Sequence, residues 1–406
     1  MEPNESERAS MAGVRVVEVG VFMAAPFAGM QLADLGADVI KVEPPGRGDP
    51  SRQIGPFVAG ESAPFVRLNR NKRSVVIDLK HPEGKEAFRR LVSTADVLLE
   101  NLRPGAMRRL GLGYDDLRVD NPRLVYASLS GWGQDGPRAG LPGLDVMAQA
   151  RAGLMSITGE PDGPPAKIGV PVCDLVCGLY AALAVTAALR ARDATGEGQH
   201  IDVSLLESGV SFAIWEAGRY FGAGEVGGRL GSAHQSTAPY QAFRTSDGWV
   251  TLGAVTPKTW AALCDLLGLE ELHAAQRYAD AYDRQRLRAE LAPAIEAATS
   301  TWTTERLLDA LDEAGVPCAP IADYAEVFAD DHLHERDFFW DAPHPRLGPV
   351  RQIGSPMRMS GTPVVRHRAG PPLGADTRAV LAEAGMSDRA FDELRASGAV
   401  QDVGEE

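Results

Sequence analysis

Apolar positions in the first 210 residues alternate between short runs typical of buried strands and longer runs typical of helices. The pattern predicts strands at 14–21, 38–43, 74–79, 96–100, 123–130 and 200–205, and helices at 27–35, 81–95, 175–189 and 207–221. Strands that alternate with helices form a parallel sheet with helices on its faces. We therefore predict an α/β fold with its ligand at the carboxyl ends of the strands.

The pattern changes after residue 224. Residues 237–255 are typical of a β-hairpin with its turn at 246–248, and they precede helices predicted at 257–268, 284–298 and 303–314 and a strand within 315–323. From residue 328 onward there is little periodicity before a final helix. We predict a large domain in 1–224, a smaller α/β domain in 225–327, and a C-terminal segment in 328–406.

The longest apolar run, at 175–189, follows directly after Asp174. This run is nearly free of polar residues, so it predicts a helix that is buried on most faces. Asp174 has two interpretations at its start. It is either an ordinary N-cap, or a carboxylate held at the positive end of the helix and directed into a cleft. Composition does not distinguish them.

Composition and charge exclude several classes of function. The net charge of −14 over 406 residues disfavours nucleic acid as a partner. The four cysteines show no metal-ligand spacing with histidines, which indicates reduced thiols and neither a disulfide framework nor a metal site. The turn after the first strand lacks the GxGxxG pattern of dinucleotide-binding proteins, which argues against NAD.

The beginning of the chain and its apolar runs bear on location. The first residues, MEPNESERAS, are polar and acidic, so we expect no signal peptide. No uninterrupted apolar run reaches about 18 residues, the length expected for a membrane span. We expect a cytoplasmic enzyme without a membrane partner.

The sequence around Asp174 resembles that of the class III CoA-transferases, the CaiB/BaiF family that includes formyl-CoA transferase and α-methylacyl-CoA racemase. A small apolar lead precedes Asp174, and an alanine-rich helix, a glycine turn and a strand follow it; the matching positions after the aspartate are Gly178, Thr195, Gly196, Gly198 and Gln199. The stretches LADLGADVIKVEPPGRGDPSR and ENLRPGAMRRLGLGYDDL also match, and the resemblance covers about 13–400.

This resemblance implies a large Rossmann-like, parallel-sheet CoA-binding domain to which the C-terminal segment 328–406 returns, with a smaller α/β domain, in an interlocked homodimer. It makes Asp174 the nucleophile and CoA a co-substrate, with no permanently bound cofactor. By the same resemblance, the CoA-binding positions are Phe22, Ala24, Arg47, Lys72, Arg73, Asn101, Leu102, Arg103 and Arg109. The basic run 69–73 is equally typical of a solvated charged surface. Gly227 and Gly228 match a mobile glycine loop, although their segment is also typical of a flexible linker.

The implied reaction moves CoA from an acyl-CoA to a carboxylic acid, through a mixed anhydride and an aspartyl-CoA thioester, with succinyl-CoA as a candidate donor. The alternative is a 2-methylacyl-CoA racemase or epimerase of the same fold. Leu144 and Thr256 stand where the racemases carry their histidine and glutamate, and neither side chain transfers a proton. Asp145 is the acid beside Leu144 that would support racemisation. A third interpretation is a catalytically silent CoA-binding protein, against which the retention of Asp174 argues.

Overall fold

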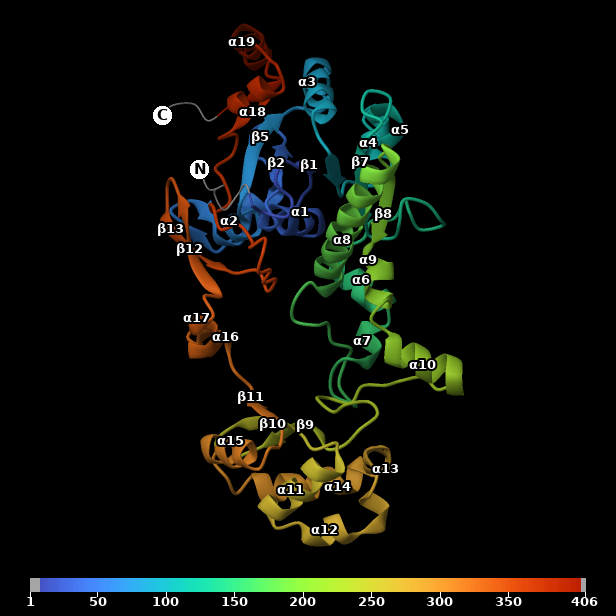
Figure 1. Cartoon of the computed structure of the whole chain (residues 1–406). Coiled ribbons are helices and arrows are strands. Elements are labelled where there is room, and N and C mark those ends of the chain that lie inside the picture. Colours follow the sequence, from blue (N-terminus) through green and yellow to red (C-terminus); the bar gives the residue numbers. More distant parts are fainter. Residues whose placement is uncertain (1–7, 403–406) are drawn as a thin grey trace. The chain divides into compact units, whose positions relative to one another are not determined.

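The computed structural model describes residues 8–402, and the chain divides into two compact units. The first comprises the described residues of Met1–Ala152, Ile168–Ala213 and His332–Glu406, and the second comprises Gly153–Lys167 and Ile214–Asp331. In Figure 1 the red C-terminal segment can be followed back to the unit that holds the blue N-terminal strands. The domain boundaries placed after residues 224 and 327 from the pattern alone stay predictions.

A seven-stranded sheet forms the centre of the first unit, in the order β14-β5-β2-β1-β6-β7-β8. Its strands are β1 (Arg15–Val19), β2 (Asp38–Glu43), β5 (Lys72–Ile77), β6 (Val97–Glu100), β7 (Val125–Ser130), β8 (His200–Ser204) and β14 (Val400–Gln401). All of these strands except β14 are parallel to their neighbours, and β14 pairs antiparallel with β5. The predicted parallel α/β sheet is confirmed, with an antiparallel edge strand that the pattern did not indicate.

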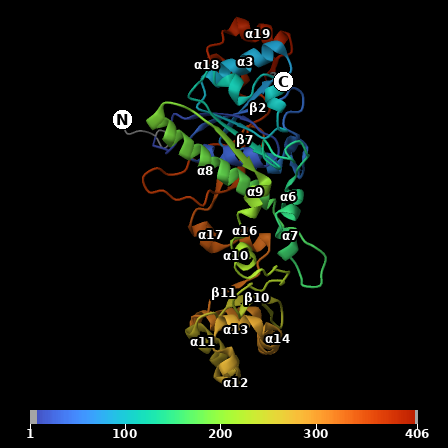
Figure 2. The ribbon, with the colours of Figure 1, turned by 90° about the vertical axis from the view of Figure 1, so that its right-hand side faces the viewer.

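Helices cover both faces of this sheet (Figure 2). On one face, α1 (Ala24–Asp34) packs against α8 (Val172–Thr195). On the other face, α3 (Pro82–Ser93), α18 (Thr377–Glu383) and α19 (Asp388–Ala396) enclose an apolar core with the strands. Because α8 carries the chain back to the start of the parallel strand β8, its first turn lies at the carboxyl edge of the sheet.

Helix α8 is longer than the predicted run and is the one described helix whose length and composition would allow it to cross a membrane. Its 24 residues include an 18-residue window of mean hydropathy 2.0, half of which is buried inside the chain. Core helices have the same composition when they pack on several sides. Here α8 packs against α1, against β7 and β8, and against α9 (Leu205–Val210).

The remaining elements of the first unit are short. They include η1 (Pro50–Gln53), β3 (Phe57–Val58), β4 (Glu61–Ser62), α2 (Ala63–Leu68), α4 (Ala106–Arg109), α5 (Tyr114–Leu117), α6 (Asp145–Arg151), and a hairpin of β12 (Phe339–His344) and β13 (Gly348–Ile353). This hairpin packs through Ala342 and Val350 on Phe65 and Val66 of α2. The sequence showed no periodicity there, because the hairpin's buried positions are few and are completed by contacts with α2.

The second unit is built on a three-stranded antiparallel sheet in the order β11-β10-β9. Strands β9 (Tyr240–Arg244) and β10 (Trp249–Gly253) form the predicted hairpin, and β11 (Cys318–Pro320) adds to it. Helices α11 (Pro257–Leu267), α14 (Arg288–Thr299) and α15 (Thr304–Glu313) enclose its core, as predicted. The helix predicted at 207–221 is instead two helices, α9 and α10 (Ile214–Ala223), and the division between the units falls between them.

Candidate active site

Asp174 lies in the first turn of α8. The helix begins at Val172 and is preceded by Pro171, so Asp174 is not the N-cap residue, and that interpretation of its position is wrong. Within residues 8–402, no side chain or backbone group donates a hydrogen bond to the Asp174 carboxylate. The carboxylate is therefore available to a ligand.

The cap of α8 is supplied by Asp145, the first residue of α6. Its Oδ1 accepts hydrogen bonds from the backbone N of Cys173 at 2.9 Å and of Asp174 at 3.3 Å. Its Oδ2 accepts another from Nε2 of Gln149 at 2.6 Å. An aspartate that accepts backbone N–H groups at a helix start performs the N-cap function. The sequence gives no sign of this role, because 28 residues separate Asp145 from Cys173.

The surroundings of Asp174 make its carboxylate unusually basic. Burial, and then the negative charge of Asp145, raise the pKa of Asp174 to about 7. Both causes disfavour the ionised form of the carboxyl group. Perturbed acids of this kind are concentrated at catalytic sites, although structural ion pairs produce them too. Together with the free carboxylate, this pKa favours the nucleophile interpretation of Asp174.

Gly178, one turn after Asp174, brings α8 into close contact with α1. A Cβ atom at Gly178 would lie 2.8 Å from the carbonyl O of Ala24, 3.0 Å from Cδ1 of Phe27 and 3.2 Å from the backbone N of Ala28. Only glycine permits this approach. The second turn of α8 therefore lies against the first turn of α1, one turn after Asp174.

The segment that joins β1 to α1 is held in one conformation by side chains from other segments. The amide of Asn101 binds both backbone groups of Val21, accepting from N at 2.8 Å and donating to O at 2.9 Å. Asp49 accepts from the backbone N of Phe22 at 3.3 Å. Phe22 has a φ of 57° and is 49% exposed. Its ring therefore remains available to a ligand, while Asn101 holds the segment through Val21.

Lys72 is fully buried, in contrast to its predicted contact with CoA phosphates. Its ammonium lies 2.7 Å from Oε2 of Glu18 and donates to the carbonyl O of Pro26 at 2.7 Å and to Oδ1 of Asn69 at 2.8 Å. These contacts use its three donors. Burial lowers the pKa of Lys72 to about 8, against the opposing effect of Glu18. The phosphate assignment of Lys72 is wrong, and its role is to fix the first turn of α1.

The same buried cluster contains a second lysine. Lys41 lies 2.9 Å from Oε1 of Glu18 and 2.8 Å from Oδ2 of Asp49, and it donates to the carbonyl O of Gly20 at 2.7 Å. All four charged side chains of this cluster, including Lys72, are fully buried. Because an unpaired buried charge is very costly, the cluster holds the β1–α1 segment in place.

Arg73 lies at the wrong edge of the sheet for its predicted role. It is near the amino end of β5, where its guanidinium forms ion pairs of 2.7 Å with Asp38 and with Glu383. Asp38 is the first residue of β2, so this cluster marks the amino edge, whereas α8 begins at the carboxyl edge. The assignment of Arg73 to CoA is therefore wrong. Within the basic run 69–73, the position of each residue along β5 determines whether its side chain is buried and at which edge of the sheet it lies.

The other predicted CoA residues are placed differently from these two. Arg103 and Arg109 are exposed and have no ion pair within residues 8–402. Arg47 is also exposed and donates to Oε1 of Gln53 at 3.1 Å. Leu102 is half-buried against the core on the α3 face, and its backbone N donates to Glu100 at 2.8 Å. The assignments of the three arginines and Leu102 stay predictions.

The predicted glycine loop belongs to the second unit, where the structure shows one reason for its composition. A Cβ atom at Gly227 would clash with Oε2 of Glu216 on α10, whereas one at Gly228 would meet nothing within 4 Å. Gly227 therefore packs closely against α10. The assignment of both glycines to a mobile loop stays a prediction.

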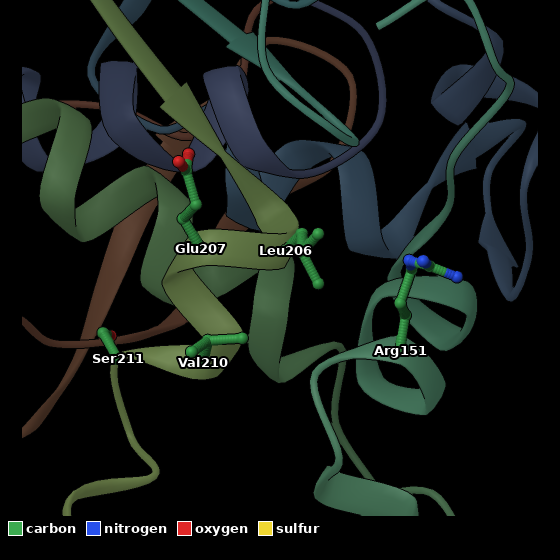
Figure 3. Close-up of a pocket in the computed structure, with 5 residues that line it drawn as sticks. All are labelled: Arg151, Leu206, Glu207, Val210 and Ser211. Carbon is green, nitrogen blue, oxygen red and sulfur yellow. The ribbon is translucent and has the colours of Figure 1, made fainter. Parts of the chain in front are cut away.

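A pocket of about 720 Å³ lies between α6 and α9 in the first unit, and Figure 3 shows the side chains that line it. They are Arg151 from α6 and, from α9 and the residue after it, Leu206, Glu207, Val210 and Ser211. Arg151 is exposed and has no ion pair in the described chain. The pocket therefore offers a guanidinium, the side chain best suited to bind a carboxylate.

Cys173 and Cys177 are buried in α8, and burial raises the pKa of both thiols well above the ordinary value. Such cysteines behave as packing residues. Across residues 8–402 there is no cluster of three or more His, Cys, Asp or Glu side chains that could hold a metal ion.

Comparison with known proteins gives one consistent result. The sequence model of CoA-transferase family III matches residues 11–377. The chain is 40% identical over 380 residues to succinate–glutarate CoA-transferase from Agrobacterium fabrum, covering 92% of this chain and 95% of that protein. It is 37% identical over 392 residues to succinyl-CoA:glutarate CoA-transferase from Homo sapiens, covering 96% and 90%. The crystal structure of a CaiB/BaiF family protein from Brucella suis superposes with a TM-score of 0.83 at 38% identity, covering 93% of this chain and 99% of that one. The chain therefore belongs to CoA-transferase family III, the CaiB/BaiF family, and is a CoA-transferase.

Proposed function

We propose that this CoA-transferase moves CoA from succinyl-CoA to a dicarboxylic acid of the glutarate class, with Asp174 as its covalent nucleophile. The relatives from Agrobacterium fabrum and Homo sapiens are both named for the succinate and glutarate pair. The observation that carries the assignment to Asp174 is its carboxylate, which has no hydrogen-bond donor in the described chain and lies one turn before the contact of Gly178 with α1.

The proposed reaction proceeds through two intermediates on Asp174. Its carboxylate attacks the thioester carbonyl of succinyl-CoA, giving a succinyl-aspartyl anhydride and the CoA thiolate. The thiolate attacks the aspartyl carbonyl, giving an aspartyl-CoA thioester and free succinate. The acceptor carboxylate then attacks this thioester, and the released thiolate takes the acceptor's acyl group from the new anhydride, which restores Asp174. No net proton transfer or redox step is needed.

The first turn of α1 is suited to stabilise the oxyanions of these steps. Its N-cap position, Met23, makes no side-chain cap hydrogen bond. Uncapped backbone N–H groups at the start of an 11-residue helix can donate to a developing negative charge. The buried cluster around Glu18, Lys41 and Lys72 fixes these donors before substrate binds, so that little reorganisation is required.

Arg151 is our candidate for the distal carboxylate of the dicarboxylic acids. It ends α6, whose first residue, Asp145, contacts the backbone of Asp174. A rise of 1.5 Å per residue places the two ends of α6 roughly 9 Å apart along the axis. We expect Arg151→Gln to raise KM for glutarate at least about tenfold, while KM for a monocarboxylic acid of similar length stays constant. Equal changes for both acids would contradict this role.

The racemase alternative lacks its acid–base pair. Leu144 is 65% exposed at the start of α6, and Thr256 caps α11 through a hydrogen bond from the backbone N of Thr259. Asp145 is occupied by the hydrogen bonds described above. We therefore expect no exchange of the α-hydrogen of a 2-methylacyl-CoA in D₂O at a rate near turnover.

The decisive experiment is to incubate the enzyme with succinyl-CoA in the absence of acceptor and to digest it for mass spectrometry. We expect a CoA adduct on the peptide that contains Asp174, and none in Asp174→Ala. Normal turnover by a folded Asp174→Ala enzyme would end the covalent proposal.

We also propose that the enzyme is an interlocked homodimer. Apolar side chains are exposed along α8 and α10: Leu183 is 65% exposed, Ile214 71% and Phe221 84%. Exposed apolar side chains of this size, on either unit, are typical of surfaces that bind another protein. Sedimentation that shows a stable monomer at micromolar concentration would contradict the dimer.

A further inference from the structure

The first turn of α8 has an unusual arrangement of hydrogen-bond acceptors. An aspartate three residues into a helix lies among backbone N–H groups that lack an intrahelical partner, and these commonly stabilise its negative charge. Here Asp145 of α6 accepts from the N–H groups of Cys173 and Asp174 instead, at 2.9 and 3.3 Å. The donors nearest to Asp174 are thereby occupied by another carboxylate.

Asp145 is itself held by a buried amide. Gln149, which is fully buried, donates through Nε2 to Oδ2 of Asp145 at 2.6 Å, and its Oε1 accepts from the backbone N of Ile168 at 2.9 Å. Gln149 therefore joins α6 to the segment that leads into α8. The position of Asp174 relative to α6 depends on this chain of hydrogen bonds.

We propose that Asp145 is a positioning residue for the transfer reaction, which caps α8 in place of Asp174 and keeps the Asp174 carboxylate free of donors and electron-rich for attack on the thioester. This inference rests on the proposed nucleophilic role of Asp174. A carboxylate that accepts no hydrogen bonds is a stronger nucleophile than one stabilised by backbone N–H groups. Loss of Asp145 would release two N–H groups to Asp174 and allow the first turn of α8 to shift.

The test compares Asp145→Ala and Asp145→Asn with wild type in the rate of adduct formation from succinyl-CoA in a single turnover. We expect Asp145→Ala to lower this rate and kcat about 100-fold, with KM for succinyl-CoA within about threefold of wild type. Asp145→Asn retains an acceptor for the Cys173 N–H but loses the charge, so its rate should be intermediate. Asp280→Ala is the matched control, because Asp280 caps α13 (Ala281–Arg286) by accepting from the backbone N of Tyr282 and Asp283.

The outcomes separate the inference from the proposed function. If wild type forms no adduct on Asp174, the nucleophile proposal fails, and the inference fails with it. If wild type forms the adduct and both Asp145 variants form it at the wild-type rate, the inference alone is overturned. Should Asp145→Ala not fold, the result rests on Asp145→Asn: a rate lowered in Asp145→Asn but not in Asp280→Ala supports positioning, and equal losses of rate and stability in both indicate a purely structural cap.

Discussion

Replacing Gly178 by alanine should impair transfer by separating α8 from α1. The new Cβ would lie 2.8 Å from the carbonyl O of Ala24, and ordinary contacts begin at 3.4 Å, so the helices must move apart by roughly 0.6 Å. Overpacking of a rigid contact costs about 1–3 kcal/mol, and the better helix propensity of alanine returns up to about 1 kcal/mol. We expect a net loss of about 1–2 kcal/mol in the free energy of unfolding.

The effect on catalysis should exceed the effect on stability. A misplacement near 1 Å costs on the order of 100-fold in rate, so a shift of about half that size predicts roughly a tenfold fall in kcat. The assay is steady-state CoA transfer from succinyl-CoA, with urea unfolding measured on the same preparations. Gly218→Ala is the control, because a Cβ at Gly218 in α10 meets nothing within 4 Å and alanine should stabilise the helix. Full activity of Gly178→Ala at unchanged stability would refute the close-contact argument.

Four further predictions follow from the same geometry. The value of kcat/KM should fall as pH decreases through about 7, because protonation of Asp174 removes the nucleophile; activity that is unchanged down to pH 5 would contradict this. As pH rises from about 4 to 7, the stability of wild type relative to Asp174→Asn should decrease, because the folded state holds the proton of the Asp174 carboxyl group more tightly than the unfolded state does; pH-dependent unfolding measures this decrease. Glu18→Gln should cost about 3–5 kcal/mol in urea unfolding, because it leaves two buried ammonium groups poorly paired. Arg73→Ala should leave KM for succinyl-CoA unchanged while Asn101→Ala raises it severalfold. A raised KM in Arg73→Ala with an unchanged KM in Asn101→Ala would restore the phosphate assignment of Arg73.

The local pattern was sufficient for the central elements of the fold. Strand β2 was predicted with its observed bounds, and the hairpin of β9 and β10 was predicted with its turn. Buried parallel strands and apolar helices carry their periodicity within a few residues, so no distant contact is needed to recognise them. The hairpin of β12 and β13 was missed because its buried face is completed by contacts with α2, and the edge strand β14 was missed because its partner, β5, is far away in the chain.

Some features of the candidate site were likewise predictable from the sequence, and others depend on the tertiary structure. The sequence alone, through its resemblance to one family, singled out Asp174 and Gly178, and the family itself is confirmed over residues 11–377. The sequence could not show that Lys72 is buried against Glu18, because a run of basic residues looks the same whether it faces solvent or the core. It also could not show that Asp145 caps α8, since a hydrogen bond across 28 residues exists only once α6 and α8 are packed together. Residue type and spacing determined which groups are present, and the tertiary structure determined which of them remain free to react.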